Sequence, residues 1–355
     1  MDEPIAAWRE RIRAAAATQS PLRIVGGGSK DFYGQELSGE RFDTDSYRGI
    51  VDYDPTELVI TARCGTPLAQ IEQALQGAGQ MLAFEPPHFG PSATLGGCIA
   101  AGLSGPRRPY AGAVRDVVLG VRLLDGRGDD LSFGGRVMKN VAGFDVSRLI
   151  TGSLGTLGVI LEVSLKCLPR PKTETTVVFE MTVAEALCRF NDWSRMPLPL
   201  SASCWHGNRL TVRLSGADSA VAGAAARIGG DRLPDAEAFW NAVREQTHLF
   251  FTEARAALWR ASVRATASQP EVGGEPLIEW GGALRWFNVA TQEDGQALRT
   301  WAGQQGGHAT LFRAADKSAG AFQPLAPALL ALHRRLKAAL DPAGVLNPRR
   351  MYAEL

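Results

Sequence analysis

The sequence predicts an α+β protein with two domains. Three observations lead to this prediction: a length of 355 residues, short β-branched runs that alternate with glycine-rich turns up to about Pro171, and an Ala- and Trp-rich alternation of strands and helices after it. At roughly 100–200 residues per domain, the length is enough for about two cores. We expect the domains to cover 1–172 and 173–340, with a C-terminal segment over 341–355.

Strands in the first domain are predicted over Leu22–Val25, Leu58–Ala62, Val117–Leu124 and Val159–Lys166. The stretch 5–17 predicts an amphipathic helix. A second helix is predicted over 67–78, because apolar residues recur there at helical spacing. Thr66 is its expected cap, and Pro67 suits the first helical position.

In the second domain, strands are predicted over 175–181, 210–214 and 283–290, and helices over 184–195, 218–228, 293–302 and 325–340. The last helix should stop at Asp341-Pro342. Seven of the 8 tryptophans lie in this domain. We expect them in its core, and a protein interface is the alternative.

Composition excludes several classes of protein. The 38 Lys+Arg balance 37 Asp+Glu, so no strong field attracts nucleic acid. The 5 cysteines contain no Cys-x-x-Cys pair, which argues against a disulfide scaffold, a zinc ribbon or an iron–sulfur cluster held by this chain alone. No apolar run reaches the ~20 residues of a membrane helix, and the start does not resemble a signal peptide. We therefore expect a cytoplasmic protein without a transmembrane segment, a metal or a nucleic-acid partner.

The 39 glycines are the main anomaly, and they cluster in loops at 26–30, 91–105 and 152–158. Such loops let main-chain N–H groups approach a ligand closely, and Ser29 and Lys30 add donors and positive charge to the first. Asp31 stands where a Gly-x-Gly-x-x-Gly motif needs its last glycine, and no P-loop occurs. Each loop alone could be an ordinary turn. Together they suit a large, elongated ligand held mainly by main chain.

In combination and order, these segments resemble the FAD-binding domain of the vanillyl-alcohol-oxidase, or p-cresol-methylhydroxylase, type. The resemblance is carried by the stretches 26–30, 93–97, 110–112 and 152–158. The stretch 341–348 is similar to the end of flavoenzymes that act on D-2-hydroxy acids. The stretches 84–90 and 103–110 resemble the smaller FAD-binding subunits of bacterial glycolate oxidases. The implied fold is a two-subdomain FAD-binding domain followed by a smaller α+β domain.

The resemblance also implies which residues bind FAD. The loop at 26–30 would hold the pyrophosphate of FAD. The segment 94–105 would lie near the pyrophosphate and the isoalloxazine ring, and residues 155–160 would hold the adenine side. Asn347 would reach back toward the flavin. The full set is Gly26, Gly27, Gly28, Ser29, Lys30, Thr94, Gly96, Gly97, Ser104, Gly105, Gly155, Gly158, Ile160 and Asn347. The FAD should be non-covalent, because the first loop contains no histidine.

No catalytic residue is identified. Lys139 is a candidate for a cation beside the flavin. His88 is a candidate base, with a structural histidine in a Pro-rich turn as the alternative. Related enzymes carry two closely spaced histidines that hold a metal and act as base, whereas His206, His248, His308 and His333 lie far apart. We therefore expect substrate chemistry mainly on a partner.

The implied function is that of an FAD-binding subunit in a glycolate oxidase (glycolate dehydrogenase) complex. Glycolate, or D-lactate, would be oxidised to the 2-oxo acid, which is glyoxylate in the first case. Its expected partners are a larger FAD-containing sister subunit and an iron–sulfur subunit that receives the electrons and could hold the assembly at the inner membrane. Two alternatives are a self-sufficient FAD-dependent D-2-hydroxy-acid dehydrogenase and a structural subunit with a relic flavin fold.

Overall fold

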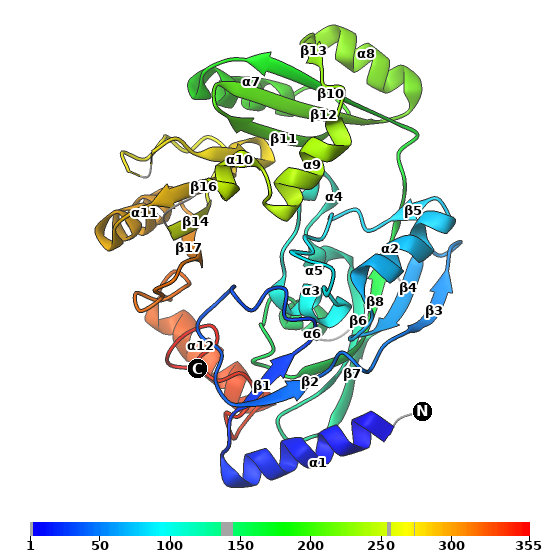
Figure 1. Cartoon of the computed structure of the whole chain (residues 1–355), viewed down its shortest axis with the longest axis vertical. Helices are drawn as coiled ribbons and strands as arrows, with labels where there is room; N and C mark the ends of the chain where they lie inside the picture. The colour runs from blue at the N-terminus through cyan, green and yellow to red at the C-terminus, as the bar shows by residue number, and fades with distance from the viewer. Residues whose placement is uncertain (1–2, 136–144, 254–256, 273) are drawn as a thin grey trace.

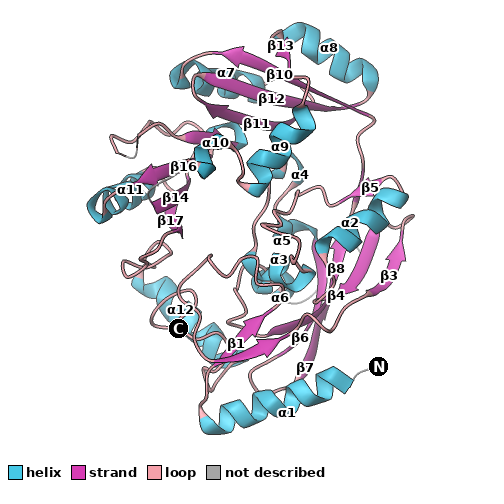
Figure 2. Cartoon of the chain, in the orientation of Figure 1, coloured by secondary structure: helices cyan, strands magenta, loops and turns pink. Residues whose placement is uncertain are grey.

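The computed structural model describes residues 3–135, 145–253, 257–272 and 274–355. Two large β-sheets, each with helices packed on it, form the two halves of the molecule (Figure 2). Strands and helices mix in both halves, which confirms the predicted α+β class.

The sheet of the N-terminal half has the strand order β3-β4-β8-β6-β7 within the described residues, and all its pairs are antiparallel. Its strands are β3 (Ile50–Asp54), β4 (Val59–Arg63), β6 (Val118–Leu124), β7 (Asp130–Gly134) and β8 (Val159–Lys166). Around it lie α1 (Glu3–Thr18), α2 (Leu68–Gly77), α3 (Leu95–Ala101), α5 (Val114–Val117) and α6 (Val146–Ile150). The short α4 (Arg108–Ala111) contacts the second sheet, which is described below. Ile12 of α1 and Ile71 of α2 are fully buried in the core that this sheet shares with its helices.

Two short pairs complete this half: β1 (Leu22–Val25) with the parallel β2 (Glu40–Asp43), and β5 (Gln80–Met81) with β9 (Leu168–Pro169). The C-terminal segment returns to β1 (Figure 1). There the Leu22 N–H donates to the Val345 carbonyl at 2.7 Å, and the Asn347 N–H donates to the Leu22 carbonyl at 3.0 Å. The two ends of the chain therefore build one edge of the fold.

The second sheet is antiparallel, with the order β13-β10-β12-β11-β15-β16-β14-β17 in the described part of the chain. Its strands are β10 (Thr173–Glu180), β11 (Leu200–His206), β12 (Arg209–Gly216), β13 (Asp231–Arg232), β14 (Ala257–Ser262), β15 (Leu277–Glu279), β16 (Leu284–Val289) and β17 (His308–Arg313). The helices that accompany it are α7 (Val183–Ser194), α8 (Asp218–Ile228), α9 (Ala236–Glu245), α10 (Leu249–Thr252), η1 (Trp280–Gly282) and α11 (Gln292–Gln304). The last helix, α12 (Pro327–Leu340), lies instead beside the N-terminal half, where the Gly126 N–H donates to the Leu340 carbonyl at 2.8 Å (Figure 1).

Most predicted elements are confirmed, with ends that move by one to three residues. The strands at 22–25 and 159–166 and the helix at 218–228 match residue for residue. Six of the seven second-domain tryptophans are buried, and Trp301 packs against a core from its edge. The cap of α2 was predicted wrongly: Pro67 occupies the cap position, because the Thr66 hydroxyl bonds to the main chain of Gly49 instead.

A buried ion pair secures the end of α12. The Lys337 ammonium donates to Asp341 Oδ2 at 2.6 Å and to the carbonyls of Thr156 and Leu346 at 2.8 and 2.7 Å. Asp341 Oδ2 also accepts from the Leu346 N–H at 2.8 Å. Burial lowers the pKa of Lys337, but the carboxylate and two carbonyls use all three of its donors. The pair therefore holds three chain segments together.

Asp341→Ala should destabilise the protein by about 3–5 kcal/mol, because it leaves the Lys337 ammonium buried without its counter-ion. Urea unfolding of the full chain measures the change. Glu10→Ala is the control, since Glu10 pairs with Arg13 on the surface and its loss should cost less than about 1 kcal/mol. Equal stability losses in the two variants would contradict the role assigned to Asp341.

Candidate functional site

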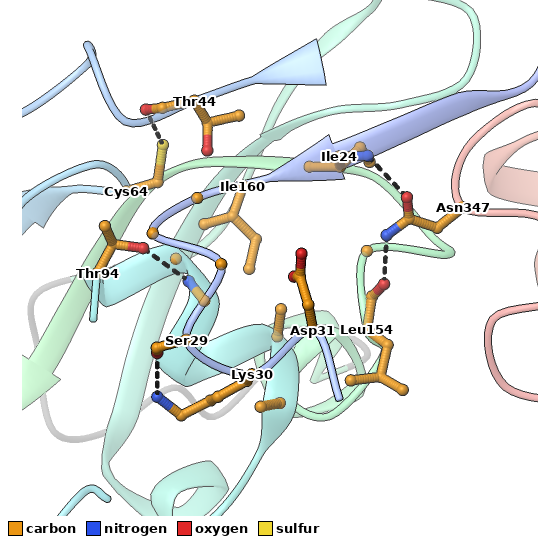
Figure 3. Close-up of a pocket in the computed structure, with 18 of the residues that line it drawn as sticks. Ile24, Ser29, Lys30, Asp31, Thr44, Cys64, Thr94, Leu154, Ile160 and Asn347 are labelled. Atoms are coloured by element: carbon orange, nitrogen blue, oxygen red, sulfur yellow. Dashed lines mark hydrogen bonds between the residues drawn. The ribbon is translucent and has the colours of Figure 1, made fainter. Parts of the chain in front are cut away.

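A pocket with about 730 Å³ of empty space lies where β1 runs into the first glycine-rich loop (Figure 3). Four stretches of chain supply most of its lining, namely 24–31, 94–101, 154–160 and the C-terminal segment with Asn347 and Arg350, and Leu37, Thr44 and Cys64 complete it. These stretches are far apart in sequence, so the pocket exists only in the folded chain.

The loop at 26–30 offers unpaired donors to this pocket. Within the described residues, the main-chain N–H groups of Gly27, Gly28, Ser29 and Lys30 have no protein acceptor. The Lys30 ammonium lies beside them and bonds to Ser29 Oγ at 3.4 Å and to the His88 carbonyl at 3.2 Å. Successive free N–H groups beside a cation form an anion-binding concavity.

Close packing explains part of the glycine content of this loop. A Cβ on Gly27 would lie 1.5 Å from the carbonyl oxygen of Ser92, and the Ser92 hydroxyl donates to the Gly27 carbonyl at 2.7 Å. Gly28 has φ of +71°, a region that residues with a Cβ rarely adopt. The loop is therefore shaped by its contact with residues 92–94 as well as by what it can bind.

Asn347 closes the opposite end of the pocket. Its Oδ1 accepts from the Ile24 N–H and its Nδ2 donates to the Leu154 carbonyl, both at 2.7 Å (Figure 3). A Cβ on Gly155 would lie 2.7 Å from Asn347 Nδ2. This carboxamide thus links β1 to the loop before β8, and the apolar side chains of Ile24 and Ile160 line the pocket beside it.

Buried cations give this region a positive character. Burial lowers the pKa of Lys30, because the charged amine is separated from water. Burial also lowers the pKa of Arg350, to about 10, and the guanidinium donates to the Asp31 carbonyl at 2.9 Å. Arg23 pairs with Asp31 at 2.9 Å, so the one carboxylate of the loop is already neutralised.

The structure brings together all the predicted FAD-binding residues except Ser104 and Gly105, which line a separate, neighbouring pocket. His88 lies outside the lining of the first pocket, with Nε2 3.1 Å from the Glu72 carboxylate and with its own N–H donating to Glu245 at 3.0 Å. These contacts fit the structural alternative for His88. Lys139 lies outside the described residues.

Sequence reasoning missed several lining residues, among them Asp31, Thr44, Cys64 and Arg350. Arg350 follows the predicted Asn347 by three residues, so its place was the easiest to infer. Thr44 and Cys64 end or follow strands, and nothing in their local pattern points to a ligand. Their position depends on how β2 and β4 pack.

No group of three or more His, Cys, Asp or Glu side chains that could hold a metal occurs among the described residues. His206 and His248, which are distant in sequence, have ring centroids 5.4 Å apart. Burial lowers the pKa of both imidazoles, Glu275 and Glu253 partly oppose this shift at His206, and the Phe250 ring lies 5.3 Å from that of His206.

Comparison with known proteins first defines the class. Residues 5–134 match the family of the FAD binding domain, and residues 316–351 match the C-terminal domain of FAD linked oxidases. Among solved structures, an alkyldihydroxyacetonephosphate synthase has the same fold, with a TM-score of 0.66 at 16% identity over 96% of this chain and 74% of that one. These matches indicate the class of FAD linked oxidases, and the relative described next, at 50% identity over 98% of this chain, establishes an FAD-dependent oxidoreductase family.

One relative is similar over nearly its whole length. The chain is 50% identical over 346 residues, 98% of it and 97% of the relative, to glycolate oxidase subunit GlcE of Escherichia coli. It therefore belongs to the family of that subunit. Partial relatives are glycolate oxidase subunit GlcD of Bacillus subtilis (33% identity, 36% of this chain and 27% of that one) and D-lactate dehydrogenase [cytochrome] 1 of Saccharomyces cerevisiae (32% identity, 40% and 24%).

The residues present fit FAD. The cofactor is elongated, with a dianionic pyrophosphate between an adenosine and a ring system. The unpaired N–H groups of 27–30 and the Lys30 ammonium suit the anion. The cleft between Ile24, Leu154 and Ile160 is apolar and suits a flat aromatic group.

Gly27→Ala should destabilise the chain by about 3 kcal/mol or more in the absence of added FAD, because the new Cβ overlaps the main chain at Ser92. Gly97→Ala is the matched control. Its Cβ meets only Thr94 Oγ1, at 3.3 Å, so its stability should change by less than about 1 kcal/mol. Thermal unfolding of both FAD-free variants tests this. A Gly27→Ala variant as stable as the wild type would show that the glycine serves only the ligand.

Proposed function

We propose that this chain is an FAD-binding subunit of a glycolate oxidase complex that oxidises glycolate, or D-lactate, to the 2-oxo acid. The observation that carries the proposal is the 50% identity to the E. coli subunit along 98% of the chain. The pocket supports it, because it presents donors where an FAD-binding domain needs them.

In this proposal the loop at 26–30 binds the pyrophosphate of a non-covalently held FAD with its N–H groups and Lys30. Residues 155–160 of the pocket lining contact the adenosine. They lie near β1, to which Asn347 is hydrogen-bonded. Residues 94–105 lie near the pyrophosphate and the isoalloxazine ring of the bound FAD. When bound, FAD supplies two-electron chemistry by accepting a hydride equivalent. We also propose the division of the chain into units over 1–172, 173–340 and 341–355.

The partners are also part of the proposal. The described residues hold no metal-binding group, and four of the five cysteines are buried and apart, so an iron–sulfur subunit is needed to carry electrons onward. We propose a larger FAD-containing sister subunit as the second partner. In the described part of the chain no helix is long and apolar enough to cross a membrane. A cytoplasmic location, with contact to the inner membrane through the partners, fits this assembly.

The purified chain, incubated with FAD and freed of excess, should show a bound flavin spectrum. Anaerobic glycolate should then bleach this flavin only when the partner subunits are present. Bleaching of the isolated chain would instead support a self-sufficient dehydrogenase. A chain that stays colourless would support the structural subunit and contradict the proposed function.

Lys30→Met should weaken FAD binding about 10-fold to 100-fold, because it removes a charge-assisted contact to the pyrophosphate. Flavin fluorescence titration measures the affinity. Lys172→Met is the matched control, since Lys172 is exposed and 4.0 Å from Asp218. If both variants bind FAD like the wild type, Lys30 does not contact the cofactor.

The pH dependence should follow the lowered pKa of Lys30. Burial shifts that pKa below its ordinary value of 10.5, so the ammonium loses its proton at a lower pH than an exposed lysine does. FAD affinity should fall as the pH rises through this pKa. Lys30→Arg should flatten the fall, because arginine stays protonated. If FAD affinity falls equally with pH in the wild type and in Lys30→Arg, a group other than Lys30 causes the fall.

A further inference from the structure

A second pocket, with about 330 Å³ of empty space, lies between the two halves of the molecule. Ser104 and Gly105, the predicted FAD-binding residues that do not line the first pocket, line this one. Its walls are mainly apolar and come from both halves: Pro87, Phe89, Leu103, Pro106, Val243, Leu284, Trp286 and Phe312. Few polar side chains reach it, so each of them is informative.

Arg260 of β14 lines this pocket; its charge interacts with those of Tyr33 and Glu279, but it forms no hydrogen bond or ion pair with a described residue. Its guanidinium carbon lies 5.1 Å from the ring centroid of Trp280 and 5.9 Å from that of Trp286. Among the described residues, no acceptor forms a hydrogen bond or an ion pair with it. The two aromatic faces hold the cation in place and leave its five N–H donors unused.

The other charged side chains in the lining are engaged. Arg244 pairs with Glu245, Nε to Oε1, at 2.8 Å. Glu279 accepts from the Trp286 indole N–H at 2.8 Å, and burial raises the pKa of its carboxyl to about 7. Arg260 is therefore the charged group of this lining that lacks a hydrogen bond or ion pair to any described residue.

Gln246, which follows α9, supplies an independent observation. Its side chain is 8% exposed and lines the same pocket, and its Oε1 is buried with no hydrogen-bond donor in the described structure. An unsatisfied buried acceptor is costly and rare in folded proteins. The pocket thus contains a guanidinium whose N–H donors are unused and a buried acceptor that lacks a donor.

We propose that this pocket binds a small 2-hydroxy monocarboxylate, with the carboxylate on the Arg260 guanidinium and the 2-hydroxyl donating to Gln246 Oε1. The planar fork of arginine matches a carboxylate. The substrate class rests on the proposed function, whereas the anion site rests on the pocket alone. A dicarboxylate should be rejected, because the apolar walls and Glu279 leave its second charge without a partner.

If the pocket binds the 2-hydroxy acid, this chain itself contacts the substrate. The missing pair of close histidines argues that proton abstraction occurs elsewhere, but it does not prevent this chain from binding the acid. The pocket borders Gly105 on one side and β14 on the other. A bound acid would therefore lie between the FAD-binding half and the second sheet.

The test is a titration of the full chain, loaded with FAD, with oxamate at constant ionic strength. Oxamate carries one carboxylate and an amide that can donate to Gln246, and it is not oxidised. Because Trp280 and Trp286 flank Arg260, tryptophan fluorescence should report binding. Arg260→Met and Gln246→Leu should each weaken oxamate binding roughly 10-fold or more, with partial recovery in Arg260→Lys.

Arg264→Met is the matched control, because it removes an exposed arginine of the same segment that bonds to the Gln305 carbonyl. Its oxamate affinity should equal that of the wild type, and malonate should not bind. Unchanged affinity in both Arg260→Met and Gln246→Leu would overturn the proposal. So would oxamate binding that FAD abolishes, since the space would then belong to the cofactor.

Failure of the proposed function can be told apart from failure of this inference. If the chain does not take up FAD, the oxamate titration is run on the chain alone. A loss of binding in Arg260→Met then supports the anion site without the flavin. If FAD binds but oxamate does not, the inference fails and the flavin proposal stands.

Discussion

The pocket depends on one constraint, the return of the C-terminal segment to β1. Two of its walls come from residues 24–31 and 154–160, and among the strands of the described residues none of the five-stranded sheet pairs with β1. The Asn347 carboxamide bonds to both walls, and the Lys337–Asp341 pair fixes the segment that carries it.

The same logic limits what the sequence could predict. Strands such as Val159–Lys166 follow from local β-branched patterns, and the glycine loops follow from their composition. The role of Asn347 could be placed near the flavin only through a family resemblance, because its bonding partners lie 323 and 193 residues away. Nothing in the sequence around Arg260 indicates that it lines a binding pocket. An arginine between apolar strand residues is usually read as a solvated face, and its isolation shows only when the second sheet is folded against Ser104 and Gly105.

Electrostatics connects the two pockets. Burial lowers the pKa values of Lys30, Arg350 and Arg260; Arg350 is buried, and the other two are partly exposed. Arg350 and Lys30 both donate to carbonyls, and Lys30 also lies beside free N–H groups, whereas Arg260 is flanked by aromatic faces. Unpaired buried cations are costly for the folded state. Two partly buried cations without an ion pair, one in each of two neighbouring pockets, are understandable if anions bind there: a pyrophosphate in the first and a carboxylate in the second.

The contacts between the two halves of the molecule determine how the two proposed anion sites are positioned relative to each other. Glu85 Oε1 lies 3.2 Å from Arg107 Nε in the first half and 2.7 Å from Arg213 Nη2 of the second sheet, and Arg107 also pairs with Glu174. Both arginines are buried, so water screens these pairs only weakly. The network sits next to Gly105, whose carbonyl accepts from the Trp280 indole at 3.1 Å. Trp280 in turn packs on Arg260. The Glu85 network thus fixes the second sheet against residues 105–107, and with it the position of Arg260 relative to this segment.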